Sequence, residues 1–272
     1  MKKQKSHLAL KITATLVASA VIAVGIGAVT IRFFTTAKYF RVTDVVSIQE
    51  KGVTLSHLVG RNIFSIDLRE QAHLLTERYP IYKQVRLVRV LPNRIFVDFL
   101  RRRPLGLIRL YKLYSVDEDC VLFDVPQEAA GIDLPLIVGL ETKIFGPKAG
   151  KKFAVRELEL ALSIIKEAQA NRLLRSWKMR RIDCSLPANA AFYLEVPIRL
   201  PSDGQAQRTS KLALLAKADL LEVKIGADTI RTKMGILSDL LIQLKNDWLT
   251  IKYMDLRFKE PVIKFKDTNV KK

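Results

Sequence analysis

The sequence predicts an α+β protein with an N-terminal transmembrane helix, a small β-α-α-β-β domain and a larger mixed α+β domain with an extended, antiparallel-rich sheet. Three observations support this fold class. Residues 12–31 contain no charged side chain. Residues 40–104 combine period-two segments with a helix-periodic one, and residues 105–265 interleave short strands with two amphipathic segments. The chain is therefore divided into an anchor and two soluble units.

The composition limits the classes of partner. The 272 residues carry a formal net charge of +19, and 49% of them are hydrophobic, which is enough for a sizeable core. A strongly basic chain usually meets nucleic acid, an anionic membrane surface or an acidic polymer. Because Lys and Arg recur in every segment and form no separate tract, a solvated basic surface near anionic lipid or cell wall is favoured over a nucleic-acid site.

Residues 12–31 are expected to form an uncleaved signal anchor. As a helix this run is about 30 Å long, which matches the bilayer core. The basic residues that flank it are Lys2, Lys3, Lys5 and Lys11 before the run and Arg32, Lys38 and Arg41 after it. The denser N-terminal flank places residues 1–11 in the cytoplasm as a short tail. A cleavable signal peptide is the competing interpretation, although its apolar region is usually shorter.

The first soluble unit, residues 40–104, is expected to place two helices on one face of a small sheet. The expected elements are a strand at Phe40–Ile48, a helical turn at Thr54–Val59, a helix, and two strands joined by a turn at Pro92-Asn93. Asp67 has the features of the N-cap of that helix, because Glu70 follows it at capping-box spacing. Pro80 ends the same helix.

The second soluble unit, residues 105–265, is expected to alternate strands and helices. The expected strands are Leu105–Leu110, Lys112–Val116, Val121–Val125, Lys178–Cys184, Ala191–Leu200, Leu221–Gly226 and, last, Ile251–Phe258. Apolar stripes predict a helix over Arg156–Leu174 and another that contains Ile230 and Leu244. A turn-rich loop at Pro201–Gln207 and a helix-prone segment at Ser210–Ala218 are expected between them, and residues 266–272 are expected to be a disordered tail.

The residue pattern indicates no catalytic, cofactor or metal site. None of the three histidines has a carboxylate or cysteine at ligand spacing, and no nucleophile-elbow, phosphate-loop or zinc-protease motif occurs. Three consecutive acids, Asp117 to Asp119, are interpreted as a solvated turn rather than a metal site. Cys120 and Cys184 are either two buried thiols or one disulfide. We therefore expect no enzyme activity, no cofactor and no metal.

The ordered motifs of the chain resemble the FtsQ/DivIB family of bacterial cell-division proteins, from the anchor to about Phe265. The matching motifs are Gly60-Arg-Asn62-Ile-Phe64-Ser-Ile-Asp67, Val88-Arg89-Val-Leu-Pro92-Asn93, Arg103-Pro104, Leu134-Pro-Leu-Ile-Val-Gly139 and Tyr253-Met-Asp255-Leu-Arg257-Phe258. The resemblance implies a POTRA domain over residues 40–104 and the family's β domain over residues 105–265. The POTRA motif residues, expected to be mainly structural, are Gly60, Asn62, Phe64, Pro80, Arg89, Pro92 and Asn93.

The chain departs from the family pattern at three places. Leu100-Arg101-Arg102 stands where the family often has a glutamate before Arg-x-Pro, so a contact made by that glutamate is not carried over. Cys120 lies near a turn position that is usually glycine in the family. Residues 201–218 are longer than the corresponding family segment and are interpreted as an insertion.

The resemblance implies a non-enzymatic division scaffold. Its expected partners are small bitopic coiled-coil proteins of the FtsB/FtsL or DivIC/FtsL type, which it would couple to septal wall synthesis. The partner-binding residues carried over to the last expected strand are Tyr253, Asp255, Arg257 and Phe258. Period-two alternation puts the first three on one face and Phe258 on the other, and the strand is expected at a sheet edge.

The implied location is the cytoplasmic (inner) membrane at the division septum, in a single-pass type II topology with the body outside the cytoplasm. The alternative is a POTRA-bearing, membrane-anchored transport or assembly factor, or a periplasmic chaperone. That class normally continues into a barrel, whose alternating strands the sequence does not predict. No nucleic-acid partner is expected.

Overall fold

The computed structural model describes residues 2–47, 55–126, 133–186, 188–196, 219–245 and 247–266, and for residues 2–14 it describes the backbone alone. The expected loop and helix at Pro201–Gln207 and Ser210–Ala218, and residues 267–272 of the expected tail, lie outside these ranges. The chain forms two compact units, Met1–Arg101 and Arg102–Lys272.

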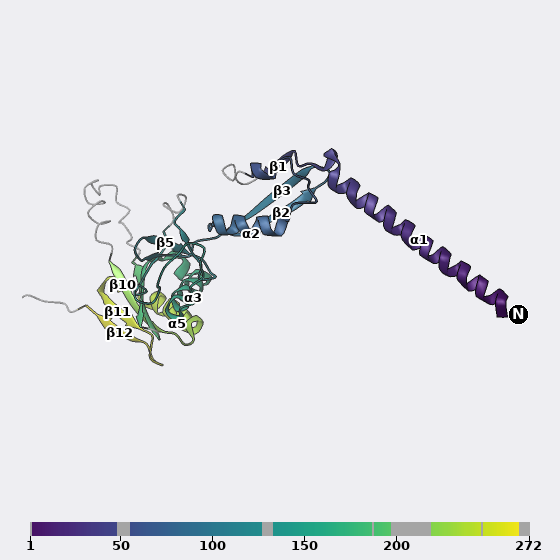
Figure 1. Ribbon diagram of the computed structural model, residues 1–272. Coiled ribbons are helices and arrows are strands. Elements are labelled where there is room, and N and C mark those ends of the chain that lie inside the picture. Colours follow the sequence, from purple (N-terminus) through teal and green to yellow (C-terminus); the bar gives the residue numbers. More distant parts are fainter. Residues whose placement is uncertain are drawn as a thin grey trace, which may run out of the picture. The chain divides into compact units, whose positions relative to one another are not determined.

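The first unit joins a long helix to a three-stranded sheet (Figure 1). Its elements are α1 (Lys2–Thr36), 3-10 turns at Lys38–Phe40 and Ser56–Leu58, β1 (Asp44–Ser47), α2 (Leu68–Arg78), β2 (Tyr82–Val90) and β3 (Arg94–Arg101). The strand order is β1-β3-β2, with β1 parallel and β2 antiparallel to β3. Within the part of the chain that the structure describes, α1 is the one helix long and apolar enough to cross a membrane, over Thr15–Thr36.

Local signals place α2 as the sequence predicts. Asp67 Oδ1 accepts hydrogen bonds from the backbone N–H groups of Arg69 (2.9 Å) and Glu70 (3.2 Å), which satisfies two of the unpaired donors at the helix start. The expected first strand is shorter than predicted, because Phe40 closes a 3-10 turn and β1 begins only at Asp44. The first of the two expected helices is a single 3-10 turn.

The second unit is a nine-stranded mixed sheet in the order β12-β11-β10-β9-β8-β7-β4-β5-β6. Its strands are β4 (Gly106–Arg109), β5 (Leu113–Val116), β6 (Leu122–Asp124), β7 (Leu136–Val138), β8 (Lys178–Leu186), β9 (Asn189–Glu195), β10 (Leu220–Gly226), β11 (Ile251–Asp255) and β12 (Val262–Phe265). Five of the eight neighbouring pairs are antiparallel, which confirms the antiparallel-rich α+β fold.

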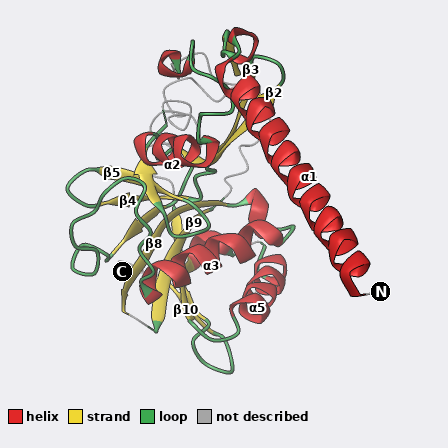
Figure 2. Cartoon of the chain, turned by 45° about the vertical axis from the view of Figure 1, so that its right-hand side comes forward, coloured by secondary structure: helices red, strands yellow, loops and turns green. Residues whose placement is uncertain are grey.

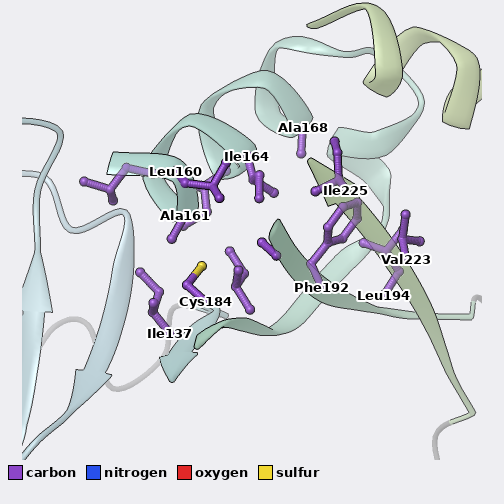
Figure 3. Close-up of a cluster of buried hydrophobic side chains, with 14 of the residues drawn as sticks. Ile137, Leu160, Ala161, Ile164, Ala168, Cys184, Phe192, Leu194, Val223 and Ile225 are labelled. Carbon is purple, nitrogen blue, oxygen red and sulfur yellow. The ribbon is translucent and has the colours of Figure 1, made fainter. Parts of the chain in front are cut away.

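Helices α3 (Arg156–Ala170) and α5 (Ile230–Gln243) lie beside each other on one face of this sheet (Figure 2). 3-10 turns at Leu174–Ser176 and Trp248–Thr250 follow them. The predicted apolar stripe of α3 is buried as expected: Leu158, Ala161, Leu162, Ile165 and Ala168. Figure 3 shows α3 packed on side chains of the central strands, among them Cys184, Phe192 and Val223. Burial of this apolar surface is the main stabilising term of the unit.

Two turn positions depend on left-handed backbone geometry. Gly139, which ends the Leu-Pro-x-x-x-Gly motif, has φ +87°, and a Cβ there would lie 2.6 Å from the backbone nitrogen of Ser185. Cys120 has φ 63°, so a side-chain-bearing residue occupies the conformation that glycine adopts at least cost. The family's usual glycine near Cys120 therefore has a physical reason.

The interpretation of the three acids as a solvated turn is wrong for Asp117. Its side chain is 3% exposed and pairs with Arg102, which is 10% exposed. Asp117 Oδ1 also accepts from the backbone N–H groups of Asp119 (3.0 Å) and Val121 (2.9 Å). Of the other two acids, Glu118 is exposed and Asp119 is half-buried. The cluster is a structural turn held by one buried carboxylate.

Candidate partner-binding edge

The C-terminal end of the nine-stranded sheet differs from the sequence prediction. The predicted last strand, Ile251–Phe258, is β11, which ends at Asp255 and is not at the edge. β11 lies between β10, to which it is parallel, and β12, to which it is antiparallel. β12, which the sequence analysis missed, is the edge strand. Its signal was the short apolar run after Pro261, but four residues are too few for a periodicity test.

An ion pair between a buried carboxylate and a partly exposed arginine holds the turn between β11 and β12. Asp255 is 4% exposed, and its two carboxylate oxygens accept from Arg257 Nε (2.9 and 3.1 Å). Oδ1 accepts from the backbone N–H of Arg257 (3.0 Å), and Oδ2 accepts from Nη2 (2.6 Å). These hydrogen bonds hold the pKa of Asp255 below its usual value and raise the pKa of Arg257. The two charges therefore neutralise each other, and the ion pair positions β12.

Tyr253 lies in a row of polar and aromatic side chains on the sheet face away from the helices. The row crosses five strands in register: Arg181, Tyr193, Glu222, Tyr253 and Lys264. The Lys224 ammonium lies 4.4 Å from the centre of the half-buried Tyr253 ring, a cation–π contact. The alternate row, which includes Met254, faces the core. Tyr253 is thus partly accessible on the open face of the sheet.

Phe258 does not share the face of Met254, because the chain has left the strand before Phe258. Its side chain is 59% exposed, and Val262 and Phe265 on β12 are 47% and 49% exposed. Phe258 lines a pocket of about 370 Å³ between the N-terminal turn of α5 and the segment that leads to β12. Arg257, Lys233 and Ile236 also line this pocket. Three exposed apolar side chains therefore flank the edge.

The four predicted partner-binding residues lie at one turn of the second unit. Tyr253, Asp255, Arg257 and Phe258 lie together at the β11–β12 turn, but only Tyr253 and Phe258 offer accessible aromatic surface. Lys233, which no sequence motif marks, is buried and donates to Asp228 at 2.9 and 3.0 Å beside the same pocket. This pair holds the pKa of Asp228 below its usual value.

The POTRA motif residues have structural positions in the first unit. Gly60 has φ +84°. Arg89 on β2 donates to the carbonyl oxygens of Ile63 (2.9 Å) and Ile66 (2.7 Å), so it fixes the loop that carries Asn62 and Phe64. Pro80 follows α2, and Pro92 and Asn93 form the β2–β3 turn, where the Asn93 carbonyl accepts from the Thr43 N–H (2.9 Å).

No group of three His, Cys, Asp or Glu side chains that could hold a metal ion occurs among the described residues. Cys120 and Cys184 are free, buried thiols. Burial raises the pKa of both thiols, that of Cys184 to about 12, so neither is poised to act as a nucleophile.

Similarity to known proteins supports the family resemblance. No protein-family model matches the chain. The chain is 29% identical over 105 residues to the cell division protein FtsQ of Myxococcus fulvus, which covers 39% of this chain and 36% of that protein. It is 23% identical over 205 residues to FtsQ of Geotalea daltonii and 24% identical over 204 residues to FtsQ of Syntrophotalea carbinolica. Each of these two matches covers 75% of this chain, and they cover 65% and 64% of those proteins.

These three similarities are consistent with the FtsQ/DivIB family. The chain spans between about one third and two thirds of the length of these FtsQ relatives. The Asp255-Leu-Arg257-Phe258 segment, which resembles the family motif, forms the corner from which the edge strand β12 starts, and its aspartate and arginine are paired to each other.

Proposed function

We propose that this chain is a membrane-anchored, non-enzymatic cell-division protein that binds small bitopic division proteins at β12. The single observation that carries the proposal is the edge strand β12, whose outer side no described segment covers, with three exposed apolar side chains around it. The names of the FtsQ relatives support the division role. The apolar span at Thr15–Thr36 supports the membrane anchor.

An open edge strand can bind a partner through backbone hydrogen bonds. A partner segment in extended conformation would add a tenth strand beside β12, pairing the N–H and C=O groups that point away from β11. Side chains of that added strand would lie against Val262 and Phe265. A neighbouring apolar side chain would enter the pocket beside Phe258. The backbone bonds give affinity, and the apolar contacts select the sequence.

The charges around the edge indicate the chemistry of the partner. Exposed lysines surround β12, at Lys252, Lys259, Lys264 and Lys266, and the described exposed acids near them are Glu260 and Asp219, of which Asp219 is paired with Lys266 at 3.4 Å. Complementary charge raises the rate of encounter and suppresses wrong partners. We therefore expect acidic residues beside the partner's added strand, and FtsB/FtsL-type or DivIC/FtsL-type proteins are the proposed partners.

In this proposal the N-terminus lies in the cytoplasm, and residues 40–104 (POTRA-like) and 105–265 (β domain) lie outside it, at the septum. Binding of the bitopic partners would be coupled to septal wall synthesis. No catalytic step is assigned to the chain.

Capture of a candidate partner tests the proposal. The full-length chain in mild detergent is immobilised and offered the FtsB- or DivIC-type protein of the same organism. Phe258→Ala and Val262→Asp should each weaken capture at least about tenfold, as expected for central interface residues. Leu186→Ala, which removes another exposed apolar side chain of the second unit, should not change it. Unchanged capture by both edge variants would overturn the site.

A further inference from the structure

The C-terminal end of α1 is built into the POTRA-like sheet unit without a flexible linker. Asn62 Nδ2 donates to the carbonyl oxygens of Phe34 and Thr35, both at 2.9 Å, and so caps the last turn of the helix. Asn62 Oδ1 accepts from the Phe64 N–H at 2.8 Å, which fixes the amide in this orientation. The motif asparagine is therefore a cap for the anchor helix.

Backbone pairing and aromatic packing strengthen the same joint. The segment after the helix pairs with the motif loop through Ile63 N–H to Phe40 O (2.8 Å) and Val42 N–H to Arg61 O (2.9 Å). The rings of Phe34, Phe40 and Phe64 lie 5.2 to 5.7 Å apart by centroid. Because the apolar span ends at Thr36, this joint places the adjoining residues at the level of the lipid headgroups.

The charged side chains around this joint are all positive. The sequence contains no Asp or Glu before Asp44. Arg32, Lys38, Arg41 and Arg61 are all exposed around the joint. Exposed aromatic side chains accompany them, with Phe33 61% and Tyr39 68% exposed, as is typical of membrane interfaces. In the proposed topology these basic residues lie on the extracytoplasmic side of the membrane, where the positive-inside rule disfavours them. We therefore infer that they bind an anionic group.

A shallow hollow on the helix combines this charge with apolar surface. The junction hollow has a volume of about 420 Å³ and is lined by Val29, Arg32, Phe33, Thr36 and Ala37. Four of these five residues belong to the C-terminal end of the apolar span, Thr15–Thr36. The nearby carbonyls of Phe34 and Thr35, which would repel an anion, are already capped by Asn62.

We propose that the junction hollow binds the headgroup of an anionic phospholipid in the leaflet on the side of the globular body. The Arg32 guanidinium would donate to the lipid phosphate, and an acyl chain would lie along Val29 and Phe33. The rigid joint holds Arg32 beside the hollow. The lipid thus fixes the height of the POTRA-like unit above the membrane. This site is independent of the proposed partner edge, since every residue in it belongs to the first unit.

Native mass spectrometry of the full-length chain tests the site. The detergent-solubilised protein is offered equal amounts of phosphatidylglycerol and phosphatidylcholine with the same acyl chains. The wild type should retain phosphatidylglycerol preferentially. Arg32→Gln should reduce that preference about fivefold, the effect of one basic residue near an anionic surface. Arg32 is exposed, so the variant is expected to fold, and circular dichroism checks this.

A matched variant distinguishes a specific lipid site at Arg32 from attraction by the overall positive charge of the chain. Arg109→Gln removes the same charge from an exposed position in the second unit and should keep the wild-type preference. Equal retention of the two lipids by the wild type would overturn the proposal. So would an unchanged preference in Arg32→Gln, or an equal loss in Arg109→Gln. Partner capture should be normal in Arg32→Gln, so failure of this proposal is distinguishable from failure of the partner edge.

Discussion

The two edge strands of the nine-stranded sheet, β6 and β12, differ in whether another segment of the chain covers them. At β6 the chain covers its own edge, because Leu122 N–H donates to Lys151 O (3.1 Å) and Gly150 N–H donates to Leu122 O (2.7 Å). Leu122 and Phe123 are fully buried there. At β12 no described segment pairs with the outer side of the strand, and apolar side chains are exposed. An open edge invites unwanted pairing, and β12, whose outer side no described segment covers, is the edge where we propose that a partner strand adds.

The turns that lead into the two edges are built alike. β5 ends before Asp117 and β11 ends at Asp255, and each of these buried aspartates accepts from a backbone N–H of its own turn and from an arginine. The arginines differ in exposure, because the Arg102 side chain is 10% exposed and the Arg257 side chain is 35% exposed. The closed edge therefore has a core-like ion pair and the open edge a surface-facing one.

The largest effect is expected at the closed edge. Asp117→Ala leaves the Arg102 charge and two N–H groups without their carboxylate, so the second unit should lose about 3–5 kcal/mol of unfolding free energy. Urea unfolding of the full-length chain in mild detergent measures it, with fluorescence of Trp177 and Trp248, both in the second unit, as the probe. Asp124→Ala breaks an exposed ion pair with Lys112 on the same hairpin and should change the unfolding free energy little, because solvent screens exposed pairs. Equal losses in the two variants would contradict the comparison.

A smaller loss is expected at the open edge. Asp255→Ala should cost about 1–3 kcal/mol, because Arg257 can turn to solvent once its partner is removed. The same variant should weaken partner capture strongly, since the turn no longer holds β12. Asp239→Ala, an exposed acid on α5, is the control for both measurements. If Asp255→Ala lost the expected stability but captured the partner normally, the ion pair would not be needed to position β12 for binding.

The pH dependence of the Asp255 contribution follows from its lowered pKa. A carboxylate with a folded-state pKa below its unfolded value, about 3.9, stabilises the fold above that value and loses its effect as the pH falls through the folded pKa. The stability difference between wild type and Asp255→Asn should therefore stay constant from pH 7 to about 5 and shrink only in stronger acid. A difference that fades near neutral pH would contradict this assignment.

Local patterns predicted most of the elements, and long-range pairing decided the rest. The N-cap at Asp67 depends only on the next three residues, and the apolar stripe of α3 repeats at helical spacing. Both features were therefore predictable from the sequence. The edge position of β12 depends on which strands become neighbours, and its four residues carry no periodic signal. The burial of Asp117 depends on Arg102, fifteen residues away, which nothing local indicates. The motif Asn62 was predictable as structural, but its bond to the anchor helix was not.

Hydrogen exchange of the two edges tests the central claim most directly. The full-length chain is compared with and without its FtsB- or DivIC-type partner, and amide exchange is followed by mass spectrometry over residues 262–265 and 122–124. We predict that partner binding slows exchange in β12 at least about tenfold, because its free N–H groups become bonded, and leaves β6 unchanged. Binding that leaves β12 exchange unaltered would contradict the account.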